Sequence, residues 1–547
     1  MKKRVILMLA GLGLASSACA ALFDNSAGGP AVATVGTAAD YISLADAASS
    51  FSAVAGGINR DWTLQINNST SETANSFFGN TFGASGKLTI KPAVGTTPII
   101  HFTNLVAGAG VFGHMVIGTS SAAAPTSATV VASNNNYVID GSNTVGGTTR
   151  DLTFLVTGNG NQNNMVSVFG DNEGVVIKNA IWQMNDNTGS VAGVRFVGGL
   201  ANNPGGIPVI PDNGVVTNNL FNSPSSNNGF GIQTGLGGNG TVPAGAGAVN
   251  NLTITDNDFF VRQRGVFLNG IGSTTVARNN FTIGSSLSTA GFVYTAIFPL
   301  NNNTTTGWTH TYADNDIRVE NLPSIAGQGL NSIFIDALTT GTFNIRNNAI
   351  KSSITQATTQ SGTLMGISMA SPGSVYNIEH NSIDVKSTNS LGLASQQVGA
   401  IVGRVATNPG GSFNIRNNIL RTDATGTTAA VISLASGPLT SSGNNLVKAG
   451  PTSHVGIVGG TGYPDLASWQ AAGFDLTATG GQSVDPTTTV PPWNSELRFA
   501  NKPFGMQPVA SSTVLTDIDG DARPATNATP GADEPPSLAN VFEWSLM

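Results

Sequence analysis

Charged residues recur at one position of a repeated pattern, and their side chains could bind or transform an acidic ligand. The pattern is an alternating apolar segment, two polar residues of which the second is asparagine, and an apolar residue, as in FNIRNNAI at 343–350. Two residues before this asparagine stand Arg278, Arg346, Glu379 and Arg416. On stacked repeats the three arginines would form a basic track for an acidic polysaccharide. The alternative is an exposed stripe of ion pairs, which contributes little to stability.

The recurring asparagines also have two interpretations. Asparagine tolerates the left-handed backbone region, and its amide bonds to nearby backbone groups, so it suits a sharp turn. Stacked on successive repeats, the amides would also bond one another in a structural ladder. The alternative is a row of amides that binds sugars. The predicted ladder consists of Asn219, Asn257, Asn280, Asn315, Asn348, Asn381, Asn418 and Asn445.

Aspartates in turns are the candidate metal ligands. Two D-N-D turns, at 256–258 and 314–316, place carboxylates close enough to bind calcium, and solvated turn aspartates are the alternative. The segment DIDGD at 517–521 is similar to a calcium loop, but its glycine comes too early and Ala528 stands where an EF-hand needs glutamate. No two histidines have metal-ligand spacing on one element. We therefore expect no metal and no cofactor, with calcium as the alternative.

The repeats predict the elements that must position these residues. A second apolar segment, such as Ile333-Phe334-Ile335, precedes each of the later asparagines, so each repeat carries at least two short strands. Phe343 and Ile345 alternate with polar residues and are expected to point inward. The irregular spacing of the copies suits stacked β-coils with loops of different lengths. The sequence predicts an all-β protein, a parallel β-helix solenoid, with a helix over 43–51 that caps its first coil.

Composition narrows the class of protein. The chain has 547 residues, a formal net charge of −7 and 40% hydrophobic residues. Charged residues make up 10%, against about 25% in average proteins, and hydrophobic content this high is not typical of disorder. We expect no nucleic-acid partner, because no basic face is apparent. No stretch of the mature chain is apolar and long enough to span a membrane.

The first residues of the chain predict where the protein is located in or outside the cell. A basic head, an apolar run and the small residues Ala18-Cys19-Ala20 form a secretory signal at 1–20, so the mature chain is expected outside the cell. A lipoprotein acylated at Cys19 is the alternative. We expect an N-terminal cap with the first coils at 21–120, the β-helix at 121–450, the last coils and a C-terminal capping segment at 451–534, and a tail at 535–547.

Three segments resemble the pectate-lyase-like superfamily of right-handed parallel β-helix proteins. They are the N-I-x-x-N repeats, NNYVIDGSNTVGGTTRDLTF at 135–154, and the C-terminal block that closes with TDIDGDARP and PGADE at 516–534. The resemblance implies a right-handed helix and a secreted bacterial protein. Its members include polysaccharide lyases, glycoside hydrolases and surface proteins with no known reaction. No set of catalytic residues from the superfamily maps onto this chain.

Two functions remain open from the sequence. The first is a secreted or cell-surface protein with a structural or glycan-binding role and no catalysis. The second is a polysaccharide lyase or glycoside hydrolase that acts on acidic polysaccharide. The enzyme would need several charged side chains that meet on neighbouring coils, and scattered charges would favour the scaffold. Its candidate residues are Arg195, Arg262, Arg264 and Lys178, with Glu173 or Asp336 nearby.

Overall fold

The structure is a computed structural model of the whole chain. The predicted signal peptide, with Cys19, and residues 536–547 of the predicted tail lie outside the residues that it describes. The structure describes residues 23–26, 31–80, 82, 86–103, 113–118, 136–157, 164–169, 172–185, 190–197, 211–223, 228–235, 249–284, 293–300, 307–323, 329–336, 340–355, 363–387, 398–404, 411–424, 428–448, 450, 452–476, 496–498, 514–524 and 528–535.

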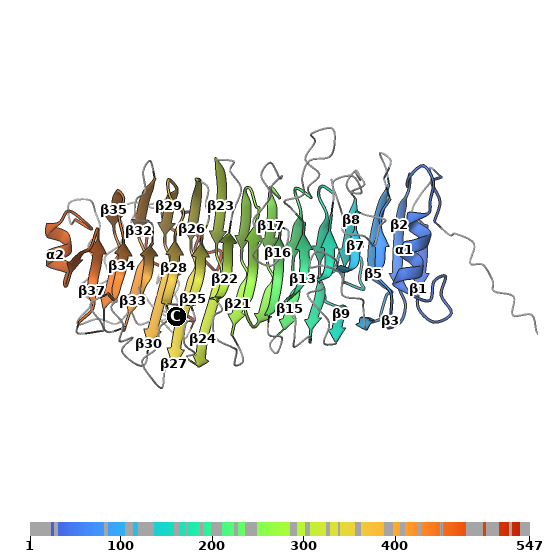
Figure 1. Ribbon diagram of the computed structural model, residues 1–547, viewed down its shortest axis with the longest axis horizontal. Helices are drawn as coiled ribbons and strands as arrows, with labels where there is room; N and C mark the ends of the chain where they lie inside the picture. The colour runs from blue at the N-terminus through green and yellow to red at the C-terminus, as the bar shows by residue number, and fades with distance from the viewer. Residues whose placement is uncertain are drawn as a thin grey trace, which may run out of the picture.

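The chain winds into a parallel β-helix in which each coil contributes strands to three long sheets (Figure 1). We call them sheets I, II and III, in the order in which a coil enters them. Sheet I has 13 strands: β1 (Ala31–Val35), β2 (Asp61–Ile66), β5 (Lys87–Pro92), β8 (Tyr137–Asp140), β11 (Val176–Lys178), β14 (Val215–Thr217), β17 (Leu252–Thr255), β20 (Thr274–Ala277), β23 (Trp308–Ala313), β26 (Gly341–Arg346), β29 (Val375–Glu379), β32 (Ser412–Arg416) and β35 (Leu439–Ser442).

The other two sheets follow the same order along the rod. Sheet II has 12 strands: β3 (Thr70–Glu72), β6 (Ile99–Thr103), β9 (Leu152–Thr157), β12 (Ala180–Met184), β15 (Leu220–Ser223), β18 (Asp258–Val261), β21 (Asn280–Ile283), β24 (Asp316–Pro323), β27 (Ala349–Thr355), β30 (Ser382–Ser387), β33 (Ile419–Thr422) and β36 (Asn445–Lys448). Sheet III has 13 strands: β4 (Ser76–Phe78), β7 (Gly113–Ile117), β10 (Asn164–Val168), β13 (Ser190–Phe196), β16 (Asn228–Thr234), β19 (Arg264–Asn269), β22 (Val293–Leu300), β25 (Gly329–Ile335), β28 (Thr363–Met369), β31 (Val398–Gly403), β34 (Ala430–Leu434), β37 (His454–Val458) and β38 (Thr461–Tyr463).

The register keeps like residues in columns along the rod. Between β26 and β29, Phe343 pairs with Tyr376 and Ile345 with Ile378, and all four are buried. The predicted inward direction of Phe343 and Ile345 is therefore confirmed. Because parallel strands lie about 4.8 Å apart, rings in one column can stack. Sheet II contributes five such stacked inner aromatic residues: Phe154, Trp182, Phe221, Phe259 and Phe281.

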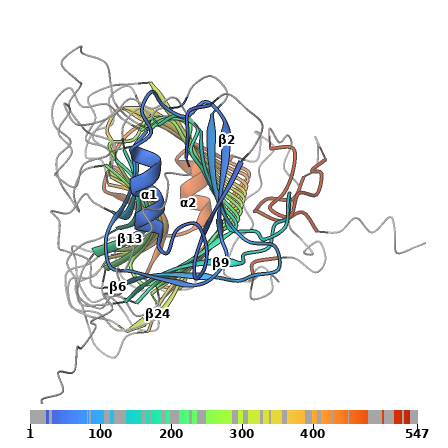
Figure 2. The same cartoon turned by 90° about the vertical axis from the view of Figure 1, so that its right-hand side faces the viewer.

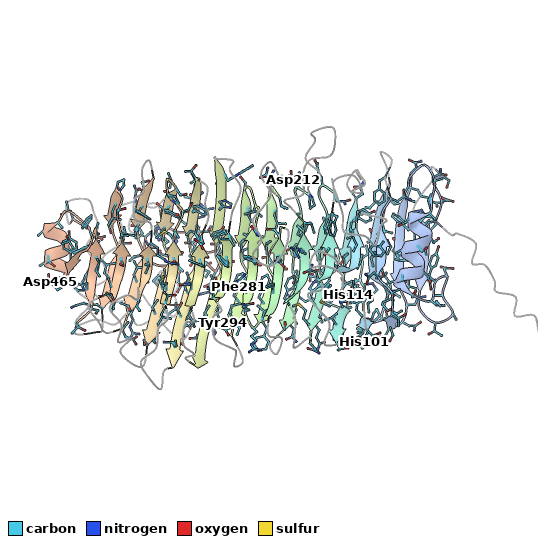
Figure 3. The ribbon with its side chains drawn as sticks, viewed as in Figure 1. His101, His114, Asp212, Phe281, Tyr294 and Asp465 are labelled. Carbon is cyan, nitrogen blue, oxygen red and sulfur yellow. The ribbon has the colours of Figure 1, made fainter. Side chains whose placement is uncertain are left out.

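A short helix covers each end of the stack, as seen along the rod in Figure 2. Helix α1 (Leu44–Ser52) begins at Ser43, whose side chain accepts the Asp46 amide, and buries Leu44, Ala47, Ala48 and Phe51. The predicted helix over 43–51 is confirmed. Helix α2 (Leu466–Ala471) begins at Asp465 with a reciprocal capping box and buries Trp469. Asp465 and His101 lie toward opposite ends of the rod (Figure 3). The predicted all-β parallel β-helix is thus the observed fold.

Candidate functional site

A tight turn joins sheet I to sheet II, and its two residues differ in role. The first has a positive φ of 52° to 58° in the coils that carry Asn218, Asp256, Asp314, Asn347 and Asn417. The second is a fully buried asparagine whose Nδ2 donates to the Oδ1 of the next asparagine, at 2.9–3.1 Å. The column consists of Asn219, Asn257, Asn279, Asn315, Asn348, Asn381, Asn418 and Asn444.

Each amide in this column is used by the turn itself. Nδ2 of Asn348 also donates to the carbonyls of Tyr312 and Arg346, at 2.9 and 3.0 Å, and its Oδ1 accepts the Asn315 amide. The column ends where Nδ2 of Asn444 donates to the buried carboxylate of Asp475. A sugar cannot contact these amides unless the turn is broken, so the column does not offer a binding row.

Two predicted members of the ladder lie one residue outside it. Asn280 and Asn445 begin β21 and β36, and their places in the column are taken by Asn279 and Asn444. Asn280 is exposed and donates to Asp258, its register partner on the preceding coil. Both copies contain two adjacent asparagines, so the pattern alone could not show which one turns the chain.

The same shift moves Arg278 out of the predicted basic track. Arg278 is a turn residue with φ 54°, and its guanidinium holds Asp256 of the preceding coil through two bonds of 2.8 and 2.9 Å. Arg346, Glu379 and Arg416 do form one outward column on β26, β29 and β32. The alternation of charge within this column fits the ion-pair interpretation better than a basic track.

The turn aspartates also have other partners. Asp258 pairs with Arg150 at 2.6 Å, and Asp314 accepts the Asn347 amide at 3.0 Å. Both carboxylate oxygens of Asp517 accept backbone amides, those of Asp519 and Asp521 on Oδ1 and that of Glu534 on Oδ2. Among the described residues, no group of three or more histidine, aspartate or glutamate side chains could hold a metal ion.

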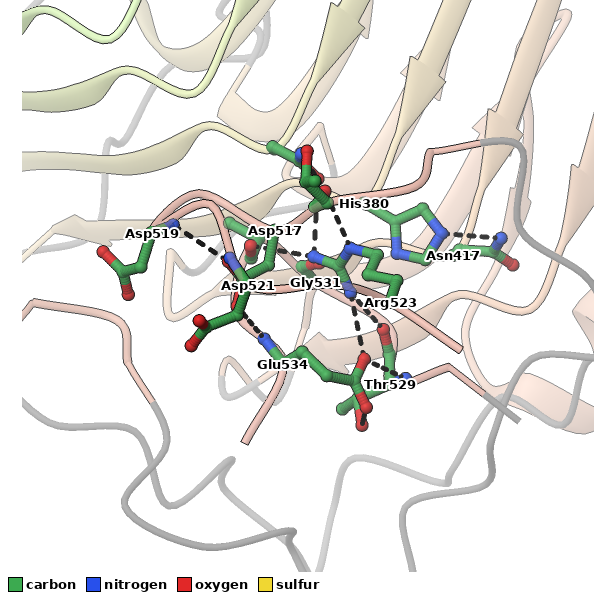
Figure 4. A network of polar contacts seen from close by, with 12 residues as sticks. His380, Asn417, Asp517, Asp519, Asp521, Arg523, Thr529, Gly531 and Glu534 are labelled. Atoms are coloured by element: carbon green, nitrogen blue, oxygen red, sulfur yellow. Dashed lines mark hydrogen bonds and ion pairs between the residues drawn. The ribbon is translucent and has the colours of Figure 1, made fainter. Parts of the chain in front are cut away.

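The C-terminal segment, residues 514–524 and 528–534, docks on the side of the rod. Figure 2 shows it outside the wall that contains β2, and Figure 4 shows Arg523 at the centre of its contacts. The Arg523 side chain is fully buried and donates to the carbonyls of Thr529, Gly531 and Ala532 and to Glu534. This network accounts physically for the D-x-D-G-x-x-R and G-A-D-E residues of the sequence.

Three contacts join this segment to consecutive coils. Asn347 donates to the Thr516 carbonyl at 2.6 Å, and the Gly531 amide donates to the Asn417 carbonyl at 2.8 Å. The Ala532 amide donates to Ser382 at 2.9 Å. The last part of the predicted capping segment therefore covers turns along the flank, and α2 covers the end.

The residues predicted for an enzyme lie on different parts of the rod. Lys178 pairs with Asp140 on sheet I at 3.2 Å, and Glu173 lies in the turn before β11. On sheet III, Arg195 donates to the Gly235 carbonyl, and burial lowers its pKa to about 10. Asp336 follows β25, and burial raises the pKa of its carboxyl against the opposing effect of Arg404. These residues do not form one acid–base cluster.

A row of phenylalanines on the outer face of sheet III was not predicted. Gly265 and Val266 both face the core, so Arg264 and Phe267 on either side of them face outward. Phe267, Phe298 and Phe334 then stack on three consecutive coils, with ring centroids 5.2 and 4.8 Å apart. The alternating pattern of a strand would place Arg264 and Phe267 on opposite faces, and the local bend changes this.

An arginine lies at each end of this phenylalanine row. The guanidinium carbon of Arg264 is 4.4 Å from the centroid of Phe267 and 4.9 Å from that of Phe298. The guanidinium carbon of Arg404, an exposed residue, is 5.4 Å from the centroid of Phe334. Rings and guanidinium planes attract each other, so the row holds both cations. The three rings and Arg264 are buried, at most 6% exposed, and Arg404 is exposed.

A second group of charges lies on sheet II, over β27, β30 and β33. The buried carboxylate of Asp384 is 3.0 Å from Lys386 and 3.5 Å from Arg421. Lys351 is its register partner on the preceding coil. Asp423 follows β33, and burial together with Asp384 raises its pKa against the lowering effects of the Ser387 amide, Arg421 and Lys386. Charged residues of three consecutive coils therefore lie close together here.

Comparison with protein-family models, with curated proteins and with solved structures found no match. None of the helices in the described part of the chain is long and apolar enough to cross a membrane. The fold defines the chain as a parallel β-helix protein.

Proposed function

We propose that this protein is secreted or displayed at the cell surface, and that its β-helix is a scaffold that binds acidic polysaccharide without cleaving it. The observation that carries the proposal is the phenylalanine row of sheet III with Arg264 and Arg404 at its ends. The two arginines lie on β19 and just after β31, four coils apart, which is about 19 Å along the rod. Cations spaced along one direction suit an extended polymer with repeated negative charges.

The chemistry of this face favours binding over catalysis. This face carries the carboxylate of Asp336. Among the described residues, Arg404 is the charged group that lowers the pKa of this carboxylate, against the effect of burial. Glycoside hydrolysis generally needs two carboxyl groups about 5 to 9.5 Å apart. We find no such pair of carboxyls among the described residues of the face.

A panel of immobilised glycans tests the proposal. The full chain is expected to be retained by polygalacturonate or alginate and to pass over neutral dextran, with retention that falls as salt rises. Arg404→Gln is expected to weaken retention, and Arg278→Gln, which removes a paired arginine elsewhere, is the matched control. Equal retention on acidic and neutral glycans would contradict the proposal.

The charge cluster on sheet II supports a second candidate, a hydrolase or lyase. Asp423, with its raised pKa, would be the proton donor or acceptor, and Arg421 and Lys386 would neutralise an acidic substrate. Release of reducing ends or unsaturated uronates by the native chain, lost in Asp423→Asn, would establish this candidate. Its matched control is Asp46→Asn, a change in the exposed first turn of α1 that leaves the cluster intact.

A further inference from the structure

We propose that the C-terminal segment is a pH-sensitive strap, which is docked on the rod at neutral pH and is released when His380 takes up a proton. The inference goes beyond the proposed function, because it concerns which part of the rod is exposed and not which ligand is bound. It rests on the position of one histidine beneath the segment, among groups that oppose a second positive charge.

His380 lies between the rod and the C-terminal segment. It is the turn residue between β29 and β30, with φ 55°, and it is fully buried. Its backbone amide donates to the carbonyl of Arg416 on the next coil at 3.2 Å. The backbones of Thr529 and Gly531, both in the segment, hydrogen-bond to its imidazole. The segment therefore helps to separate this ring from solvent.

The contact between His380 and Asn417 requires the neutral form of the imidazole. Nδ2 of Asn417 lies 3.1 Å from Nε2 of His380, as Figure 4 shows. An amide nitrogen only donates, so Nε2 accepts and carries no proton. Asn417 also anchors the segment, because its carbonyl accepts the Gly531 amide at 2.8 Å. A proton on Nε2 would place two donors against each other at this anchor.

Arg523 adds a charge that opposes protonation of His380. Its Nη1 donates to the Thr529 carbonyl at 3.0 Å and its Nη2 to the Gly531 carbonyl at 2.8 Å, so the guanidinium and the imidazole share these two neighbours. Burial and then Arg523 lower the pKa of His380 to about 3, against the raising effect of the Thr529 and Gly531 backbones. The other charged groups around this contact are Asp517, Asp533 and Glu534 on the segment, Asp314 on the rod, and Arg346, Glu379 and Arg416 in the outward column of sheet I.

Release of the segment would uncover part of sheet II. Ser382 and Ile419 are register partners on β30 and β33, and both are fully buried. Ser382 accepts the Ala532 amide at 2.9 Å, and a Cβ on Gly531 would lie 2.7 Å from Ile419, so the segment lies directly on both. Asp384 stands two residues after Ser382, and alternation places it on the same outer face. The uncovered surface therefore adjoins the group of charges on sheet II.

The sign of the pH dependence follows from the two states of His380. In the released state the imidazole reaches water, and its pKa returns to about 6.5. The released state binds the proton more tightly than the docked state, so docking weakens as the pH falls below about 6.5. Between pH 7 and pH 5 the docking equilibrium is expected to shift toward release by about 25-fold.

Hydrogen exchange of the full chain, measured by mass spectrometry at pH 7, 6 and 5, tests the inference. After correction for the intrinsic rate at each pH, protection of the Gly531 and Ala532 amides is expected to fall about 25-fold between pH 7 and pH 5. It should recover on return to pH 7, and the strands of the three sheets should stay protected throughout. His380→Asn suits the positive φ and is expected to show a change of less than about threefold, because the titrating ring is gone. His310→Phe, which removes a buried histidine of β23, is the matched control and should behave as the native chain.

Three results would overturn the inference. An equal loss of protection in the native chain and in His380→Asn would assign the pH dependence to the carboxylates. Loss of protection in the strands at the same pH would mean that the whole rod opens. Exchange of the imidazole C2 hydrogen in the native chain gives the pKa of His380 without any variant, and a value near 6.5 while the segment stays protected would also overturn it.

Discussion

At the scale of single residues, the two positions of the turn between sheets I and II have different roles. The first residue must adopt a left-handed backbone, which aspartate and asparagine tolerate better than most residues. The second must satisfy the carbonyls and the backbone amide that the bend removes from the ladder. Asparagine does this because its Nδ2 donates to the carbonyls and its Oδ1 accepts the amide. Because every Oδ1 in the column accepts from the preceding coil, each asparagine links three consecutive coils.

Replacement of one buried asparagine tests this division. Asn348→Ala removes the donor to the Tyr312 and Arg346 carbonyls and the acceptor for Asn315. We expect the free energy of unfolding to fall by about 2–4 kcal/mol, because several buried groups lose their partners. Asn344→Ala, on the outer face of the same strand, is the control and should change it by less than about 1 kcal/mol. Equal effects in urea unfolding would mean that the buried column has no special role.

His380 predicts a dependence of stability on pH. It is a buried turn residue, and burial together with Arg523 lowers its pKa to about 3, against about 6.5 in the unfolded chain. The unfolded chain therefore takes up the proton first, and His380 costs stability as the pH falls below about 6.5. Between pH 7 and pH 5 the loss from this residue is about 2 kcal/mol.

The variant His380→Asn removes the titrating group and keeps a side chain that suits a positive φ. Its melting temperature should fall less between pH 7 and pH 5 than that of the native chain. Because His114 and His310 are also buried with lowered pKa values, some dependence on pH remains in the variant. Identical slopes for the two proteins would show that His380 does not titrate in this way.

At the scale of elements, the strands of sheets I and II could be predicted because their apolar residues alternate up to a recurring asparagine. The helix at 43–51 was found from Leu44, Ala47, Ala48 and Phe51 on one face. Two features could not be predicted from the sequence, and each has a physical cause. Adjacent asparagines at 279–280 and 444–445 give two registers with the same composition. On sheet III, the bend at Gly265 and Val266 reverses the alternation, so the outward Arg264 and Phe267 could not be inferred from periodicity.

The C-terminal segment predicts a local unfolding event that leaves the rod intact. Arg523→Met removes the donors to four carbonyls and leaves Glu534 without its buried partner. Breaking such a pair from one side costs about 3–5 kcal/mol, which is enough to release the segment from the turns. Hydrogen exchange at the amides of Gly531 and Ala532 should rise by more than tenfold.

The control for this variant is Arg498→Met, because Arg498 pairs with the exposed carboxylate of Asp519 at 3.1 Å. That change is expected to leave exchange at Gly531 and Ala532 as in the native chain. The melting temperature of the rod should be nearly the same in both variants, since the strands of the three sheets are not altered. Cooperative loss of the whole rod in Arg523→Met would instead make the segment part of the core.

At the scale of the whole molecule, one interior runs through the three sheets from β1 to β37. Each coil touches only its neighbours, so stability is approximately a sum of local terms, and the ends are where strands have no partner. Unpaired edges promote association between chains, and α1, α2 and the antiparallel β38 lie where this would occur.

Loss of the α2 contact should open the last coil. Trp469 is fully buried against the final strands and donates Nε1 to Asp475 at 3.0 Å. Trp469→Ala is expected to remove about 3–5 kcal/mol of packing at that end and to expose the edge of β37. Light scattering should then show end-to-end association that grows with concentration. Gln470→Ala, a change on the same helix that leaves Trp469 in place, should remain as the native chain.

The central claim is that this protein binds an acidic glycan and does not cleave it. One measurement tests both binding and the absence of cleavage. The native chain is incubated with a defined oligogalacturonate, the bound fraction is isolated with the protein, and the glycan is released and weighed by mass spectrometry. We predict that the acid is bound in preference to its methyl ester and is recovered at its original length. Shortened or unsaturated oligomers, or recovery of acid and ester in equal amounts, would contradict it.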